Sequence, residues 1–221
     1  MADKRWLSFT ASRDWLYRLF FNHTGLRSVI SDIGDGGGTV MHCWVPRIPK
    51  QSKPNVVLIH GFGANAMWQY ADAISHFTAT FNVYVPDLLF FGRSYTRRPE
   101  RSEEFQAQCL KRLMEVHGLS RMSVVGISYG GFVGYSMAAQ FPEAVERAVL
   151  CCAGVSLEEK DMSEGLFMVR DLQEAKRILL PQTPEMLREL MRLSFARPAK
   201  RIPDWFLTDF IYVSFISSFL N

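Results

Sequence analysis

The feature that most constrains the fold of this chain is an alternation of short apolar runs with amphipathic segments between residues 56 and 155. The apolar runs are typical of strands buried on both faces, and they cover Val56–His60, Val83–Asp87, Ser123–Ile127 and Val145–Val155. The segments between them have helical spacing, over Met67–Phe77, Glu103–His117 and Gly130–Gln140. Strands and helices that alternate in this way predict an α/β fold, with a mostly parallel sheet and helices on both faces.

Two elements are predicted before this alternation. Residues 10–22 place apolar side chains at helical spacing, which indicates an amphipathic helix lying on the core, with membrane-surface binding as the alternative. The alternating runs Leu26–Asp32 and Thr39–Val45 then predict a β-hairpin around a flexible glycine-rich turn at 34–38. That turn is not a phosphate-binding loop, because it lacks the Gly-Lys-Ser/Thr ending and no helix pattern follows it.

After Val155 the strand pattern stops, and helices alone are predicted. We expect them near Ser163–Leu180, from Thr183 onward with Pro184 at the first helical position, and over Trp205–Leu220. Helices that follow an α/β core are typical of a lid. The predicted organisation is therefore a core over residues 1–156 and an incomplete helical cap over residues 157–221.

The motif that carries chemistry is Gly126-Ile127-Ser128-Tyr129-Gly130, a G-x-S-x-G pattern between a predicted strand and a predicted helix. Gly126 and Gly130 remove side chains that would collide in a sharp turn. Ser128 would then project from the carboxyl edge of the sheet, where the helix N-terminus stabilises negative charge. We predict Ser128 as a nucleophile; the alternative is an ordinary strand-to-helix turn that contains a serine.

Two further motifs occur in a fixed order with this one. His60-Gly61-Phe62-Gly63 follows the first buried run, and the second run continues from Asp87 through Phe90 and Gly92 to Ser94. Together the three motifs resemble the α/β-hydrolase superfamily over residues 26–155. The resemblance is closest to plant-type serine esterases or lipase-like members with a helical cap.

The resemblance implies roles for several of these residues. The backbone N–H groups of Phe62 and Tyr129 would form an oxyanion hole, in loops shaped by Gly61 and Gly63. Asp87 would fix a loop, and Phe90 replaces a glycine of the family pattern. A serine nucleophile argues against the epoxide hydrolase and haloalkane dehalogenase branches. The implied substrate is a small lipophilic ester or similar acyl compound, with no cofactor and no metal.

The acid and base of such a hydrolase are not found in their expected place. In this fold they follow the nucleophile in the order acid, then histidine. All the histidines precede Ser128: His23, His42, His60, His76 and His117. The later aspartates fall in or beside the predicted cap and are interpreted as solvated helix residues: Asp161, Asp171, Asp204 and Asp209. We therefore expect a truncated chain with impaired activity; the alternatives are a non-catalytic ligand-binding protein and an inactive splice or fragment product.

Charge and cysteine content exclude other classes. The net charge of +3 is weak and scattered, which argues against nucleic-acid binding. The cysteines show no metal-binding spacing: Cys43, Cys109, Cys151 and Cys152. No secretory signal and no run of about 20 apolar residues is present. The expectation is a soluble, cytoplasmic protein.

Overall fold

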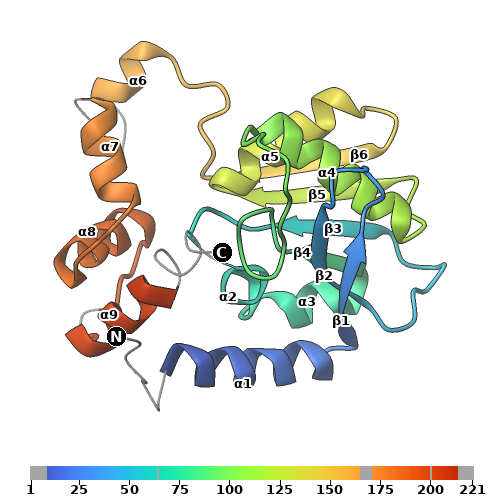
Figure 1. Cartoon of the computed structure of the whole chain (residues 1–221), viewed down its shortest axis with the longest axis horizontal. Coiled ribbons are helices and arrows are strands. Elements are labelled where there is room, and N and C mark those ends of the chain that lie inside the picture. The colour runs from blue at the N-terminus through green and yellow to red at the C-terminus, as the bar shows by residue number, and fades with distance from the viewer. Residues whose placement is uncertain (1–8, 64, 165–170, 200, 214–221) are drawn as a thin grey trace. The chain divides into compact units, whose positions relative to one another are not determined.

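The computed structural model describes residues 9–63, 65–164, 171–199 and 201–213 (Figure 1). The chain divides into two compact units. One consists of residues 14–155, and the other of residues 1–13 with 156–221. The first unit, called the core unit below, contains the sheet and all three sequence motifs.

The core unit is built on a six-stranded sheet with the order β1-β2-β4-β3-β5-β6. Its strands are β1 (Leu26–Asp32), β2 (Val40–Pro46), β3 (Asn55–Ile59), β4 (Asn82–Pro86), β5 (Met122–Ile127) and β6 (Val145–Cys151). The pairs β1–β2 and β2–β4 are antiparallel, and the remaining pairs are parallel. The prediction of a mostly parallel sheet with an N-terminal hairpin is confirmed.

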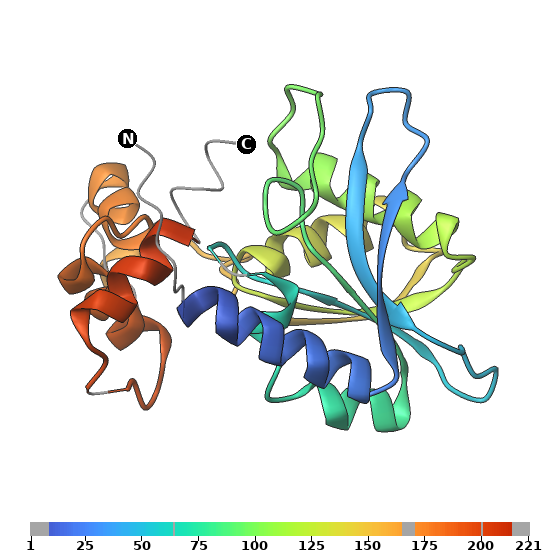
Figure 2. The same cartoon turned by 60° about the horizontal axis from the view of Figure 1, so that its bottom comes forward.

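Helices cover both faces of this sheet, as Figures 1 and 2 show. One face carries α1 (Phe9–His23), α2 (Ala66–Tyr70) and α3 (Ile74–Thr80). Their buried side chains pack with strand residues such as Trp44 and Val83. The other face carries α4 (Glu103–Val116) and α5 (Tyr129–Gln140). Both faces of the central strands are therefore buried, which explains the continuous apolar runs of β3 and β4.

Two elements of the core unit differ from the sequence prediction. The single helix predicted over Met67–Phe77 is two helices, because the N–H of Ala73 bonds to the carbonyl of Tyr70, three residues back instead of four. The last predicted strand ends at Cys151 and most of its residues are exposed, since β6 lies at an edge of the described sheet. Ser102 caps α4 as predicted, accepting a hydrogen bond from the N–H of Phe105 at 3.3 Å.

In the described part of residues 156–213, helices are the regular elements: α6 (Glu159–Glu164), α7 (Leu172–Leu179), α8 (Pro184–Ser194) and α9 (Asp204–Ile211). Leu187, Leu207 and Ile211 form a small buried cluster between α8 and α9. Thr183 caps α8 with Pro184 next to it, as predicted. The helix predicted over Ser163–Leu180 is instead α6 and α7, with Asp171 capping α7; residues 165–170 and 214–220 lie outside the described residues.

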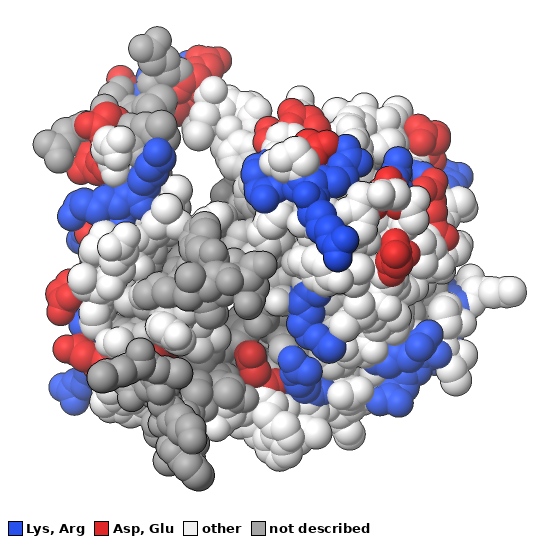
Figure 3. Space-filling view, in the orientation of Figure 1, with Lys and Arg blue, Asp and Glu red and all other residues white. Residues whose placement is uncertain are grey.

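The surface shows no continuous charged stripe on the face drawn in Figure 3. Lys and Arg side chains over the core unit form separate groups, with acidic side chains between some of them. Proteins that bind along the phosphate backbone of nucleic acids usually carry such a basic stripe on one face. Among the described residues, no helix has both the length and the hydropathy needed to cross a bilayer.

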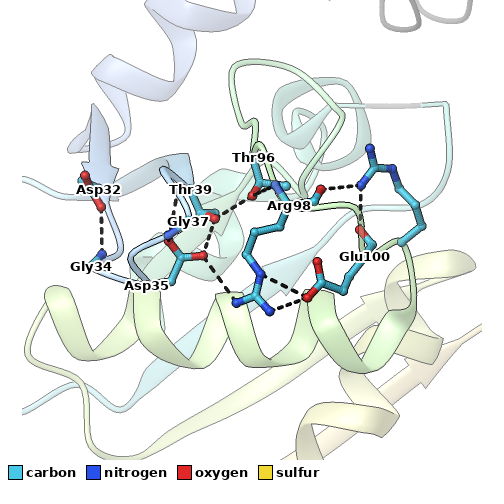
Figure 4. A network of polar contacts seen from close by, with 9 residues as sticks. Asp32, Gly34, Asp35, Gly37, Thr39, Thr96, Arg98 and Glu100 are labelled. Carbon is cyan, nitrogen blue, oxygen red and sulfur yellow. Dashed lines mark hydrogen bonds and ion pairs between the residues drawn. The ribbon is translucent and has the colours of Figure 1, made fainter.

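The glycine-rich turn between β1 and β2 is held by a polar network (Figure 4). The Asp35 carboxylate accepts hydrogen bonds from the N–H groups of Gly37 at 2.9 Å and Thr39 at 3.3 Å, and from the Thr39 hydroxyl. It also pairs with Arg98, whose side chain in turn contacts Glu100. The turn predicted as flexible is therefore anchored to the loop that precedes α4.

Candidate active site

The strand-to-helix turn after β5 holds Ser128 in a backbone conformation that is unusual for a residue with a side chain. Its φ is 54° and its ψ is −121°. Left-handed conformations of this kind cost roughly 1–3 kcal/mol for residues other than glycine. The Ser128 N–H bonds to the carbonyl of Cys151 at 2.9 Å, which ties the turn to the end of β6. The residue is exposed, and its hydroxyl does not cap α5.

Two glycines make this turn sterically possible. A Cβ atom on Gly126 would lie within 3.0 Å of the Gly130 carbonyl oxygen. A Cβ atom on Gly130 would lie equally close to the carbonyl oxygens of Ile59 and His60. These are backbone atoms of the first turn of α5 and of the end of β3, so they cannot move aside cheaply. The spacing of glycines around Ser128 therefore follows from the close approach of α5 to β3 and β5.

The loop after β3 lies directly against Ser128. A Cβ atom on Gly61 would be 3.2 Å from the Cβ of Ser128, so only a glycine leaves ordinary space there. The ring centroids of Phe62 and Tyr129 are 6.4 Å apart. Gly63 has a φ of 72°, in the left-handed region that glycine favours. The structure thus brings Gly61, Phe62 and Tyr129 together with Ser128 at the carboxyl edge of the sheet.

The two predicted oxyanion donors have unused backbone N–H groups. Within the described residues, neither the amide of Phe62 nor that of Tyr129 donates a hydrogen bond. Tyr129 is the first residue of α5, where backbone N–H groups have no partner inside the helix. An anionic oxygen beside Ser128 would meet a helix N-terminus, which favours negative charge.

Aromatic side chains form an apolar wall beside these amides. The ring of Phe91 is 5.3 Å from the ring of Phe62 and 5.5 Å from that of His60, both edge to face. Phe62 is 43% exposed, so part of this wall is open to solvent. Such a surface suits the hydrocarbon part of a ligand better than a charged group.

His60 is placed so that it cannot act as a base for Ser128. The side chain is fully buried, its Nε2 accepts the N–H of Leu88 at 2.9 Å, and its Nδ1 is 2.8 Å from the Gly61 carbonyl oxygen. Because one ring nitrogen accepts and the other donates, the imidazole is neutral. Burial lowers the pKa of His60 below its usual value. His60 therefore holds the loop after β3 against the start of the loop after β4.

Asp87 fixes the loop after β4, as the resemblance implied. Its carboxylate accepts the N–H groups of Ala66 at 3.0 Å and Arg93 at 3.2 Å, and it pairs with His42 at 2.8 Å. Burial alone would raise the pKa of Asp87, but the His42 hydrogen bond and charge, with further partners, hold it below its usual value. In the same loop Phe90 has a φ of 72°, which explains why the family pattern has glycine there.

No base or acid for Ser128 is found in the part of the chain that the structure describes. None of the five histidines is hydrogen-bonded to the Ser128 hydroxyl. Asp161 and Asp171 accept local backbone N–H groups, and Asp204 pairs with Arg188. Asp209 is only 6% exposed and is buried on α9, so its interpretation as a solvated helix residue is wrong.

Comparison with known proteins assigns the sequence to a family. The alpha/beta hydrolase fold family matches residues 54–208. The mouse (lyso)-N-acylphosphatidylethanolamine lipase is 31% identical over 130 residues, which are 55% of this chain and 37% of that protein. An uncharacterized protein of Mycobacterium tuberculosis is 38% identical over 104 residues, 47% of this chain and 30% of that protein. The match thus spans about a third of the length of these curated relatives.

A solved structure extends the likeness to the whole chain. A putative lipase from Acinetobacter baumannii superposes with a TM-score of 0.74 at 20% identity, covering all of this chain and 69% of that one. At this identity the likeness concerns the fold. Since the family match covers more than half of the sequence and includes all three motifs, the chain belongs to the α/β-hydrolase fold family.

Proposed function

We propose that Ser128 is the nucleophile of a serine hydrolase that acts on a carboxylic ester or a similar small lipophilic acyl substrate. The observation that carries the proposal is the strained backbone of Ser128, exposed at the end of β5 with its hydroxyl uncommitted to α5. Structures retain such strain where surrounding contacts enforce it, and these positions cluster at active sites. The proposed function also accords with the lipases among the family members that resemble this chain.

In the proposed reaction the Ser128 oxygen attacks the acyl carbon, and the N–H groups of Phe62 and Tyr129 stabilise the resulting oxyanion. Each such donor contributes on the order of 3 kcal/mol to transition-state stabilisation. The Ser128 proton needs an acceptor, which the described residues do not supply. Turnover by this chain alone is therefore expected to be about 10⁴- to 10⁶-fold below that of a complete triad.

The substrate class is inferred from the surroundings of Ser128. The exposed edge of the Phe62, Phe91 and Tyr129 group favours an acyl chain or another lipophilic part. We further infer that residues 157–221 form the lid of this hydrolase. Within that unit Trp205 is 54% exposed, whereas Phe206 and Phe210 pack against the α8–α9 cluster.

A fluorophosphonate carrying a reporter group tests the proposal. We expect slow covalent labelling of Ser128, located by peptide mapping, and loss of that adduct in Ser128→Ala. Phe62→Pro removes one proposed oxyanion donor and should slow labelling by about 10²-fold. Phe62→Ala keeps the N–H and serves as its matched control. The proposal fails if Ser128 is labelled no faster than an exposed serine such as Ser120.

A second candidate is a non-catalytic binding protein of the same fold. The fixed hydrogen bonds of His60 and the uncommitted hydroxyl of Ser128 favour it, because the described residues offer groups that could contact a ligand but no base for Ser128. A ligand bound without turnover would raise the melting temperature, and the shift would grow with the logarithm of the ligand concentration relative to its Kd. Thermal shifts with short-chain esters that remain intact after incubation would support this candidate over the hydrolase.

A further inference from the structure

A second serine of the core unit is hydrogen-bonded to a histidine and, through it, to a carboxylate. The Ser28 Oγ is 2.8 Å from Nε2 of His42, and Nδ1 of His42 is 2.8 Å from Oδ2 of Asp87. Ser28 comes from the edge strand β1, His42 from β2, and Asp87 from the loop after β4. The order serine, imidazole and carboxylate is that of a catalytic triad.

The protons in this chain of groups can be assigned. Asp87 is an ionised acceptor, since two backbone N–H groups and His42 all donate to it. A carboxylate can only accept, so Nδ1 of His42 carries a proton, and in the neutral imidazole Nε2 then has a lone pair. The Ser28 hydroxyl donates to that lone pair. The imidazole is therefore in the tautomer that a general base for Ser28 requires.

Ser28 is also accessible, whereas the groups behind it are not. Its residue is exposed on β1, while His42 and Asp87 are each 4% exposed. The buried hydrogen bond to Asp87 keeps the imidazole oriented, and the exposed serine can meet a reagent from solvent. Because His42 and Asp87 are both buried, His42 is not a solvated surface histidine.

The backbone of Ser28 provides a single N–H that could face a developing oxyanion. The Arg47 N–H bonds to the Gly25 carbonyl, and the Ile33 N–H bonds to the Thr39 carbonyl. These two bonds fix which β1 residues direct their N–H groups toward β2. By the alternation of an antiparallel ladder, the N–H of Ser28 points to the open edge, where no described strand pairs with β1. A serine's own N–H is one of the two oxyanion donors in trypsin-like enzymes.

We propose that Ser28 is a second acyl-accepting serine, activated by His42 and Asp87, that reacts with small activated esters and related acyl or phosphonyl donors. In the step, the Ser28 oxygen bonds to the donor's acyl carbon or phosphorus while its proton passes to Nε2 of His42. The leaving group, an alkoxide, phenolate or fluoride, departs with its electron pair. Asp87 stabilises the imidazolium, which then returns the proton to the leaving group or to water.

The described residues give this site one oxyanion donor, the Ser28 N–H, and not two, and this sets the expected rate. Loss of one donor costs a factor of about 10²–10³ in known serine enzymes. A positioned general base contributes about 10²–10⁴. Ser28 should therefore react faster than an ordinary serine and slower than the nucleophile of a complete site. The proposal does not rest on the role assigned to Ser128.

The first test uses the full chain with Ser128→Ala and a small alkyl fluorophosphonate, with adducts quantified by peptide mapping. Two internal controls are used, and neither is bonded to a histidine among the described residues: Ser31, which is half-buried on the other face of the same strand, and the exposed Ser120. We expect the Ser28 adduct to form on the order of 10² faster than any Ser31 adduct. A further change, His42→Gln, should bring the Ser28 rate down to that of Ser31.

The second test remains informative if His42→Gln fails to fold. Ser28→Cys and Ser31→Cys are compared at neutral pH with iodoacetamide, which forms a C–S bond and releases iodide. A thiol beside Nε2 of His42 should be alkylated at least tenfold faster than the thiol at position 31. Peptide mapping separates these adducts from those of exposed Cys152. Equal rates at the two positions, together with no Ser28 adduct in the first test, would overturn the proposal.

Discussion

Gly130 lies in the first turn of α5, with its Cα facing the carbonyl oxygens of Ile59 and His60. Gly134 lies one turn further along, where an added Cβ would meet only side chains, the nearest at 3.4 Å. The two glycines are both buried in the same helix, yet only the first is required by the turn. The space available to an added Cβ therefore distinguishes Gly130, which the turn requires, from Gly134, which it does not.

This contrast gives a matched pair of substitutions. Gly130→Ala should lower the free energy of unfolding by about 3 kcal/mol or more, because the backbone of β3 must shift to admit the Cβ. Gly134→Ala should be neutral or stabilising by up to about 1 kcal/mol, since alanine favours a helix. Urea unfolding followed by circular dichroism measures both. A Gly130→Ala chain as stable as Gly134→Ala would show that the described packing of α5 on β3 is wrong.

At the scale of elements, the hairpin turn and the loop before α4 are joined through one carboxylate. Asp35 accepts three hydrogen bonds and pairs with Arg98, and its side chain is 2% exposed (Figure 4). Burial alone would raise the pKa of Asp35, but the Thr39 hydroxyl and the backbone N–H groups of Gly37 and Thr39 lower it below its usual value. The ionised form is therefore the one that holds these two elements together.

Asp35→Asn should accordingly destabilise the protein by about 1.5–3 kcal/mol, the usual contribution of hydrogen bonds to a charged group. Asp32→Asn is the control in the same turn, because Asp32 is exposed and accepts a single described bond, from the Gly34 N–H at 2.8 Å. Its change should stay within about 0.5 kcal/mol. Chemical unfolding of the two variants checks the difference, and similar losses in both would contradict the anchoring role of Asp35.

The sequence predicted elements better than it predicted the contacts between them. Periodicity located every strand of the core unit and the caps Ser102 and Thr183, because these depend on local patterns. The break between α2 and α3 was missed, since it depends on one backbone bond with no glycine or proline to mark it. The hydrogen-bonded series Ser28, His42 and Asp87 was missed because its residues come from three elements. Ser28 and His42 share one face of the predicted hairpin, but only the pairing of β2 with β4 brings Asp87 to them.

At the scale of the whole molecule, buried histidines link folding to pH. Burial lowers the pKa of fully buried His60, and burial with the charge of Arg27 lowers that of half-buried His117. In the unfolded chain both titrate near their ordinary value of about 6.5. Between that value and their lowered folded values, the unfolded state binds protons that the folded state does not. The free energy of unfolding must therefore fall as the pH decreases through this window.

We expect stability to be nearly constant above pH 7 and to fall between pH 7 and 5, by at most about 1.4 kcal/mol per pH unit for each histidine. His117→Gln should keep most of this slope, because His60 is the more deeply buried and would lose its bond from the Leu88 N–H on protonation. Burial raises the pKa of Asp14, so at lower pH the folded state takes up this proton before the unfolded state does. Asp14 therefore increases the free energy of unfolding as the pH falls, opposite to the histidines. Urea unfolding at half-unit steps from pH 8 to 5 measures the curve, and a flat curve would show that His60 is not held neutral in the folded protein.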